Sequence, residues 1–149
     1  MLKNSPPFDW EECRDNQYSF SLHHPPDWHS TAPKGRCVQL QKGTSNLPGG
    51  VPEVDVFIEV RSLEGKFPDD YLLSSSRLSR SVKYTDRREL AINTLSAVRA
   101  RFESTGGPVP NWGVEYAIRK DDKVMKIYIS QPKPAIEQQF DEVVTSLRW

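Results

Sequence analysis

The residues of this sequence that could bind a metal ion are three histidines that lie close together along the chain. His23, His24 and His29 occur near Asp27, and Cys37 follows shortly after. A zinc site needs three or four imidazole, thiolate or carboxylate groups that converge on one point. Adjacent side chains of a strand point to opposite faces, so His23 and His24 could both be ligands only where a strand breaks. We therefore predict turn or surface histidines, with no metal site and no cofactor.

Nucleophilic catalysis would need a serine or cysteine beside a histidine that an acidic residue orients. The sequence contains no G-x-S-x-G elbow and no G-x-x-x-x-G-K-[ST] phosphate loop, and no catalytic motif surrounds Cys13 or Cys37. Asp55, Glu59 and Glu115 alternate with apolar residues, which indicates a solvated sheet face. We name no catalytic residue and predict a protein that is not an enzyme. The alternative is a small hydrolase-type enzyme whose histidine and carboxylate come from dispersed residues and converge in one pocket.

The two cysteines, Cys13 and Cys37, leave the redox state of the chain open. They could be two unpaired thiols, with Cys37 on a strand, or one disulfide that ties the N-terminal arm to the second predicted strand. An even number of cysteines is compatible with the disulfide. The compartment decides between the two, because disulfides persist only in oxidising surroundings.

Basic residues are unevenly distributed, with a concentration that we call the arginine band. It consists of Arg77, Arg80, Lys83, Arg87, Arg88, Arg99 and Arg101. The acidic residues within the same stretch are Asp86 and Glu89. A hairpin in this region would set Arg88 opposite Arg99, which is costly unless an anion or an acidic side chain lies nearby.

The arginine band has two interpretations. It could be a solvated face that acidic residues from elsewhere in the chain neutralise. It could instead be a docking patch for an acidic partner. The partner-binding residues predicted on the second interpretation are Arg77, Arg80, Arg87, Arg88, Arg99 and Arg101.

The composition bounds the class of protein. A chain of 149 residues fits one domain that is large enough to fold without disulfides. Its 20 basic and 20 acidic residues balance, which argues against a nucleic-acid binder or a general membrane-surface binder. No apolar run approaches the ~18–20 residues that span a bilayer, and no signal peptide is visible. We therefore expect either a cytosolic protein or a mature fragment of an exported one.

The clearest structural signal is the alternation of apolar and polar residues over 111–131. Such alternation marks half-buried strands, because successive side chains point to opposite faces. Two runs, 112–119 and 124–130, can fold back about residues 121–122. The predicted register pairs Val114 with Ile129, Tyr116 with Ile127 and Ile118 with Met125, all on one face.

The other elements follow from shorter patterns. We predict strands over 18–22, 37–41 and 54–61, a hairpin of 86–92 and 95–103 where a bulge could reverse the alternation, and helices over 69–82 and 134–148. The second helix has an apolar face of Ile136, Phe140, Val143 and Leu147. Residues 1–16 are predicted to form an irregular arm, followed by a single domain over 17–149. Three strands, a helix, four strands and a helix indicate an α+β protein built on an antiparallel sheet.

Both ends of the predicted domain resemble a known family. Residues 18–28 (YSFSLHHPPDW) resemble the YGFSF-x-YP-x-x-W opening of PsbP-like proteins, with Ser19 where the family usually has glycine. Residues 140–149 (FDEVVTSLRW) resemble the closing F-x-x-ΦΦ-x-SF-x-Φ helix of that family, where Φ is hydrophobic. The resemblance implies an α-β-α sandwich, in which an antiparallel sheet of about six to seven strands is flanked by two or more helices.

The resemblance also implies a function and a location. Family members with known roles are non-catalytic: they are photosystem accessory subunits and, on a similar fold, a eukaryotic Ran-binding factor. We therefore expect a monomeric accessory or binding module that docks onto an acidic protein partner and binds no nucleic acid. PsbP-like proteins are exported, so we expect an extracytoplasmic location in the periplasm, in the thylakoid lumen or on a lipid anchor, with the cytoplasm as the alternative.

Overall fold

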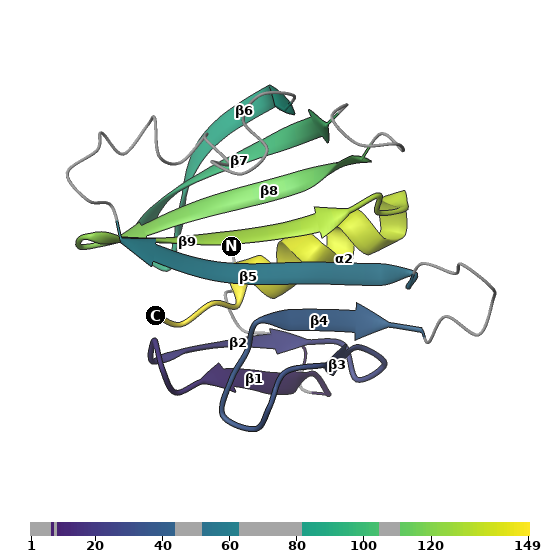
Figure 1. The fold of residues 1–149 in the computed structure, drawn as a ribbon, viewed down its shortest axis with the longest axis vertical. Coiled ribbons are helices and arrows are strands. Elements are labelled where there is room, and N and C mark those ends of the chain that lie inside the picture. The colour runs from purple at the N-terminus through teal and green to yellow at the C-terminus, as the bar shows by residue number, and fades with distance from the viewer. Residues whose placement is uncertain (1–6, 8, 44–51, 63–81, 105–110) are drawn as a thin grey trace.

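The computed structural model describes residues 7, 9–43, 52–62, 82–104 and 111–149. Its centre is a curved antiparallel sheet of seven strands, and the helix α2 lies across one face of that sheet (Figure 1). A separate two-stranded sheet, β1–β2, lies beside the end of the large sheet that β3 and β4 form (Figure 1). The predicted α+β class with an antiparallel sheet is confirmed.

The strands of the large sheet follow the order β3-β4-β5-β9-β8-β7-β6. Their bounds are His29–Ser30 for β3, Gln39–Lys42 for β4, Val54–Ser62 for β5, Val82–Ile92 for β6, Leu95–Ser104 for β7, Asn111–Lys120 for β8 and Lys123–Ser130 for β9. The small sheet pairs β1, Glu11–Asp15, with β2, Phe20–His24. Helix α2 covers Pro134–Thr145. The strand predicted over 54–61 is thus confirmed as β5.

The hairpin β8–β9 has the register that the alternation predicts. Ile118 lies opposite Met125, Tyr116 opposite Ile127 and Val114 opposite Ile129, and all six side chains are buried. The turn holds Asp121 at a φ of 54°, in the left-handed region that aspartate adopts more readily than most residues. This register gathers the apolar side chains of β8 and β9 on one face and so defines the core.

Helix α2 covers this apolar face. Ile136, Phe140, Val143 and Leu147 are all buried, as predicted. The ring of Phe140 lies 5.7 Å from the ring of Tyr116, measured between centroids. Pro134 begins the helix at a position where the missing N–H would have no helical partner in any case.

The end of α2 differs from the prediction. The helix stops at Thr145, whereas the apolar spacing predicted a helix to residue 148. The chain leaves the helix because Arg148 pairs with Ser21 of β2 through two backbone hydrogen bonds of 2.8 and 2.9 Å. Leu147 is fully buried although it lies outside the helix. The apolar residue predicted for the last turn of the helix is therefore buried, but from an extended segment.

Strand β1 corrects the expectation that residues 1–16 form an irregular arm. It pairs with β2 along its whole length. Its polarity concealed it, because the two buried residues of the strand are Cys13 and Asp15. A buried carboxylate does not count as apolar in a periodicity argument, so the alternation was not visible.

Two further strands are displaced from their predicted ranges, and one was not predicted. The strand expected over 18–22 begins two residues later, because Ser19 has a φ of 58° and belongs to the preceding turn. The strand expected over 37–41 likewise begins later, as β4. Strand β3 is two residues long, which is too short for any alternation to show.

The hairpin β6–β7 turns at residues 93–94, as predicted, and both residues have positive φ. The register shifts between Thr85 and Arg88, where Asp86 has a φ of 52°, and this confirms the predicted bulge. Beyond the bulge, Arg88 lies opposite Arg99, which is the predicted pairing of like charges.

The second helix layer of the expected sandwich is not seen in the described part of the chain, which contains one helix. The helix predicted over 69–82 lies outside the described residues, except for Val82, which begins β6. Within the ranges that the structure describes, no helix is long and apolar enough to span a bilayer.

The face of the sheet away from α2 carries a row of aromatic rings. Phe57 stacks on Tyr128 with ring centroids 5.2 Å apart, and Phe102 meets Tyr128 edge-on at 6.3 Å. Gly113 makes room for this row. A Cβ atom at Gly113 would lie 2.8 Å from the ring of Phe102 and 1.9 Å from the carbonyl oxygen of Ile129, so no other residue fits there.

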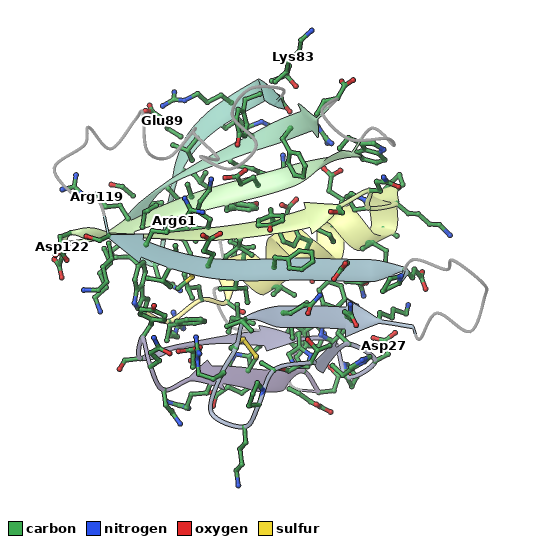
Figure 2. All side chains as sticks on the ribbon, in the orientation of Figure 1. Asp27, Arg61, Lys83, Glu89, Arg119 and Asp122 are labelled. Atoms are coloured by element: carbon green, nitrogen blue, oxygen red, sulfur yellow. A yellow bond between two sulfur atoms is a disulfide. The ribbon has the colours of Figure 1, made fainter. Side chains whose placement is uncertain are left out.

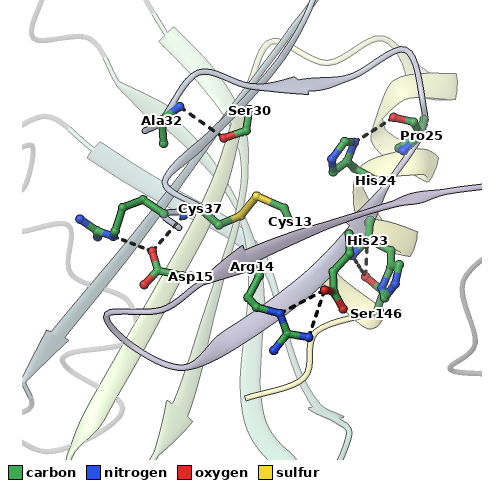
Figure 3. Close-up of a disulfide and its surroundings, with 12 residues drawn as sticks. Cys13, Arg14, Asp15, His23, His24, Pro25, Ser30, Ala32, Cys37 and Ser146 are labelled. Atoms are coloured by element: carbon green, nitrogen blue, oxygen red, sulfur yellow. Dashed lines mark hydrogen bonds and ion pairs between the residues drawn. A yellow bond between two sulfur atoms is a disulfide. The ribbon is translucent and has the colours of Figure 1, made fainter. Parts of the chain in front are cut away.

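A disulfide between Cys13 and Cys37 joins the small sheet to the segment that leads into β4 (Figure 3). Of the two states that the sequence left open, the structure has the bonded one. The buried carboxylate of Asp15 lies beside the disulfide. It accepts hydrogen bonds from the backbone N–H of Cys37 at 3.0 Å, the backbone N–H of Tyr18 at 2.9 Å and the guanidinium of Arg36 at 2.9 Å.

These hydrogen bonds keep Asp15 charged. Burial by itself would raise the pKa of Asp15, but the donors from Cys37, Tyr18 and Arg36 outweigh it and hold the pKa below its ordinary value. A lowered pKa in the folded state means that the carboxylate stabilises the fold above its unfolded-state pKa. That contribution is lost as the pH falls through the lowered value.

Phe140→Ala should lower the free energy of unfolding by about 3–5 kcal/mol, because it removes a fully buried ring that contacts Tyr116. Urea unfolding followed by circular dichroism measures the change. The control is Gln138→Ala, on the exposed side of α2, which should stay within ~0.5 kcal/mol of wild type. A Phe140→Ala midpoint equal to that of the control would remove Phe140 from the core.

The double variant Cys13→Ala, Cys37→Ala should lose about 2–4 kcal/mol of unfolding free energy, because its unfolded chain is no longer cross-linked. Wild-type protein that is denatured without reduction should show no reactive thiols. Two reactive thiols, or a double variant as stable as wild type, would contradict the disulfide.

Candidate functional site

Arg99 of β7 is turned toward α2 by the alternation of its strand, and its side chain is only 9% exposed. Its Nη2 lies 2.9 Å from Oε2 of Glu137, and its Nε lies 3.0 Å from Oδ1 of Asp141. Glu137 and Asp141 stand at i and i+4 on α2, so both project from the same side of the helix. Two carboxylates from the helix thus neutralise one buried cation of the sheet.

Tyr116 of β8 completes this group, which we call the α2 clamp. Its hydroxyl donates to Oδ1 of Asp141 at 2.5 Å and accepts from Nε of Arg99 at 3.2 Å. Burial and the adjacent Asp141 carboxylate raise the pKa of Tyr116. Burial would lower the pKa of Arg99, but the carboxylates of Asp141 and Glu137 raise it instead. Both groups keep their protons at neutral pH, so the clamp is suited to holding α2 and not to proton transfer.

Salt bridges continue from the clamp to the edge of the sheet. Arg101 binds Glu137 through both ends of its guanidinium, at 3.1 and 2.6 Å. Asp86, in the bulge of β6, lies 3.8 Å from Nε of Arg101 and 2.9 Å from Nη2 of Arg88. Burial would raise the pKa of Glu137, yet its two arginine partners outweigh this and lower it. A continuous line of ion pairs therefore links α2, β7 and β6.

The arginine band divides into residues with different surroundings. Arg77 and Arg80 lie outside the described residues. Arg99 differs from the rest of the predicted docking set, because its side chain is buried in the α2 clamp. The side chains of Arg87, Arg88 and Arg101 remain at the surface, with exposures of 36%, 62% and 40%. The acids that neutralise Arg99 come from α2, which sequence reasoning did not identify.

A groove of about 490 Å³ lies beside the α2 clamp, and we call it the Trp112 groove. It is lined by Arg101, Trp112, Pro132, Pro134, Glu137, Gln138 and Asp141. Trp112 is 43% exposed and is the one large hydrophobic side chain that is exposed among the described residues. Its carbonyl accepts a hydrogen bond of 2.8 Å from the N–H of Gln131, just before the chain enters α2. Trp112 points to the face of β8 that carries the apolar side chains of this strand. It lies, however, at a place on that face that α2 does not cover.

The three histidines do not converge. His24 corrects the expectation of turn or surface histidines, because it is buried at the end of β2, with its Nδ1 2.9 Å from the carbonyl oxygen of Pro25. His29 is exposed on β3. His23 lines a different cleft, on the other face of β2. In the ranges that the structure describes, no three histidine, cysteine or acidic side chains are placed to hold a metal ion together.

Glu115 corrects the expectation of a solvated acidic face on the sheet. It is buried, with its carboxylate 2.8 Å from Nζ of Lys126 and 3.0 Å from the hydroxyl of Tyr84. Asp55 and Glu59 are half-buried. The Glu115 carboxylate therefore forms an ion pair with Lys126 and accepts a hydrogen bond from Tyr84, where contact with solvent was expected.

Arg99→Met should lower the free energy of unfolding by roughly 2–4 kcal/mol at pH 7, because it leaves Glu137 and Asp141 without their buried cation. The control is Arg101→Met, whose more exposed side chain should contribute less than about 1 kcal/mol.

The loss caused by Arg99→Met should depend on pH. The lowered pKa of Glu137 means that the ion pair stabilises the fold above the ordinary glutamate pKa and stops doing so as the pH falls through the lowered value. Urea unfolding at several pH values between 7 and 2 should therefore show the gap between wild type and variant closing. A gap of constant size, or no gap at pH 7, would contradict the clamp.

Comparison by sequence finds no protein-family model and no characterised protein that matches this chain. Comparison by structure does find similar folds. Cyanobacterial PsbP from Synechocystis sp. PCC 6803 matches with a TM-score of 0.62 and 9% identity, over 99% of this chain and 96% of that one. LpqN, which is involved in cell envelope biogenesis of Mycobacterium tuberculosis, matches with a TM-score of 0.58 and 10% identity, over 91% and 88%.

A protein of Bacteroides thetaiotaomicron VPI-5482 also matches, with a TM-score of 0.60 and 11% identity over 95% of this chain. This chain spans about half of that protein, 48% of its length. Identities this low show a shared fold and nothing further. The chain has the PsbP-like fold that its two end motifs predicted.

Proposed function

We propose that this chain is a monomeric, non-catalytic accessory module that docks onto a protein partner outside the cytoplasm. The observation that carries the proposal is the Trp112 groove, where an exposed tryptophan lies beside two prolines at the end of a line of salt bridges. Tryptophan and arginine contribute most of the binding energy in many protein interfaces. The PsbP-like fold supports the proposal, because its members with known roles are accessory proteins.

The groove has the layout of a small protein interface. Trp112 would form the apolar centre and Arg101 the polar rim, and Arg88 follows next along the line of ion pairs, through Asp86. Arg88 uses its Nε and Nη2 on Asp86 and is mostly exposed, so further donors of its guanidinium remain for a partner carboxylate. An acidic partner fits this rim. The docking roles of Arg77, Arg80 and Arg87 rest on the sequence alone.

The edge strand β6 is not suited to adding a strand from a partner. Charged side chains such as Lys83 and Glu89 lie along it (Figure 2), and its bulge at Asp86 interrupts the edge. Exposed charges and bulges are features that prevent edge-to-edge pairing. The proposed docking therefore uses side chains and not backbone pairing.

The alternative of a hydrolase needs a histidine and a carboxylate that converge in one pocket. His23 and Glu12 do line the same cleft, together with Ser19 and Ser21. The carboxylate of Glu12, however, is bound to Arg14 at 3.0 Å, and neither serine makes a hydrogen bond to the His23 ring among the described residues. These groups are not arranged as a nucleophile and its base.

The location outside the cytoplasm is supported by the disulfide. Reducing systems keep thiols unpaired in the cytosol, whereas disulfides persist in the periplasm and in other oxidising compartments. The role of LpqN in cell envelope biogenesis agrees with this. A periplasmic, lumenal or lipid-anchored setting is therefore proposed.

An affinity pull-down from envelope extracts of the source organism tests the proposal. Trp112→Ala should reduce the retained partner at least tenfold and leave stability unchanged, because it removes an exposed anchor. Arg88→Glu combined with Arg101→Glu should weaken retention more at low salt than at high salt.

The control for these variants is Arg119→Glu, an exposed arginine at the opposite end of β8 from the groove (Figure 2). It should retain the partner as wild type does. If all three variants and wild type hold the partner equally, the docking site lies elsewhere.

A further inference from the structure

A second cleft, of about 710 Å³, lies between the small sheet, the β6–β7 turn and the segment that follows α2. Leu95, one of its lining residues, stands at the end of β7 that is remote from the Trp112 groove. Clefts of about 300–1,000 Å³ are typical of small-molecule sites. The cleft is separate from the proposed docking surface, so what it binds does not depend on the proposed function.

The register of the small sheet places polar side chains along one wall of the cleft. Cys13 and Leu22 are paired and turn into the core, so their neighbours face the other way. Glu12 pairs with His23 and Arg14 with Ser21, which places these side chains on the face that lines the cleft. A row of polar groups therefore lies along one wall.

Among the described charged side chains that line the cleft, one cation has no acidic partner. Arg14 and Glu12 bind each other at 3.0 Å, so their charges cancel. Arg148 lines the same cleft, and no acidic side chain of the described residues lies within ion-pair distance of it. Its backbone is fixed by two hydrogen bonds with Ser21. The backbone of Arg148 is thus fixed at the cleft, and its guanidinium is a positive charge without an acidic partner among the described residues.

The opposite part of the cleft is apolar and held in place. Trp149 is half-buried, and its Nε1 donates to the carbonyl oxygen of Tyr18 at 3.2 Å. Nζ of Lys120 lies 5.8 Å from the centre of the Trp149 ring. Leu95 is also half-buried and packs against the core. Both side chains offer apolar surface that is already ordered.

We propose that this cleft binds an organic anion with one acidic head group and an apolar body. The head group, a carboxylate or sulfonate, would bind Arg148, and the apolar body would lie on Leu95 and Trp149. An inorganic anion would leave the apolar wall unused, and a polyanion would find a single unpaired cation, Arg148, among the described side chains that line the cleft. A lining cation without an acidic partner, beside a fixed aromatic surface, matches a single negative charge on an apolar molecule.

Fluorescence titration with a matched pair of probes tests the proposal. 8-Anilinonaphthalene-1-sulfonate carries one sulfonate, and N-phenyl-1-naphthylamine has the same ring systems without the charge. Arg148→Gln should weaken binding of the sulfonate about tenfold, the loss of one charge-assisted hydrogen bond, and should leave the neutral probe within about twofold. Trp149→Ala should weaken both probes, with circular dichroism to verify that the variant is folded.

Two controls locate the probe. Arg119→Gln removes an exposed arginine elsewhere, and Trp112→Ala removes the one large hydrophobic side chain that is exposed among the described residues. Both should bind the sulfonate as wild type does. Unchanged sulfonate affinity in Arg148→Gln, or an equal loss of both probes, would overturn the proposal.

The same head-group chemistry can come from a free molecule or from the C-terminus of a peptide. Octanoate and a peptide ending in leucine with a free carboxylate serve as competitors, and the C-terminal amide of that peptide serves as the control. Displacement of the sulfonate probe by one of the two acids supports the proposal and identifies the source. Displacement by neither acid, or by the amide as effectively as by the free peptide, would overturn it.

Discussion

Arg99 can be buried against α2 only because the helix brings two carboxylates to it, and the position of α2 follows from that requirement. An unpaired buried charge costs several kcal/mol, so Glu137 and Asp141 must lie over Arg99 whenever the helix packs on the sheet. Apolar contacts have no direction of their own and would let the helix slide. The fork of hydrogen bonds from Arg99 selects one placement, the one in which Phe140 lies against Tyr116.

The placement of α2 also determines which parts of the sheet stay open. The helix begins too late to cover the start of β8, so Trp112 keeps an exposed face. Glu137 serves Arg99 and Arg101 at once, which connects the clamp to the rim of the Trp112 groove. At its other end, α2 stops early enough for Arg148 to pair with β2, and this pairing closes one side of the second cleft. One helix thus borders both candidate sites.

Alternation was sufficient to predict β5, β8 and β9, because each strand has three or more apolar residues at alternate positions, which point to one face. It was insufficient for β1, whose buried residues include the carboxylate of Asp15, and for β3, which is too short. Arg99 was predicted as part of a surface band, either a solvated face neutralised by acids from elsewhere in the chain or a docking patch, and no local pattern showed that those acids would come from α2 and bury it. The spacing of Glu137 and Asp141 beside Phe140 was the one available signal. The exposure of Trp112 depends on where α2 begins over the sheet, which no local pattern specifies.

In-cell photo-crosslinking tests most directly whether the Trp112 groove faces a protein partner. A photoreactive amino acid at Gln138, an exposed residue that lines the groove, would react with any protein bound there. The same amino acid at Asp122, in the exposed β8–β9 turn, reports on chance encounters (Figure 2). We expect one discrete adduct from Gln138 and none from Asp122. The same adducts from both positions, or none from Gln138, would contradict docking at the groove.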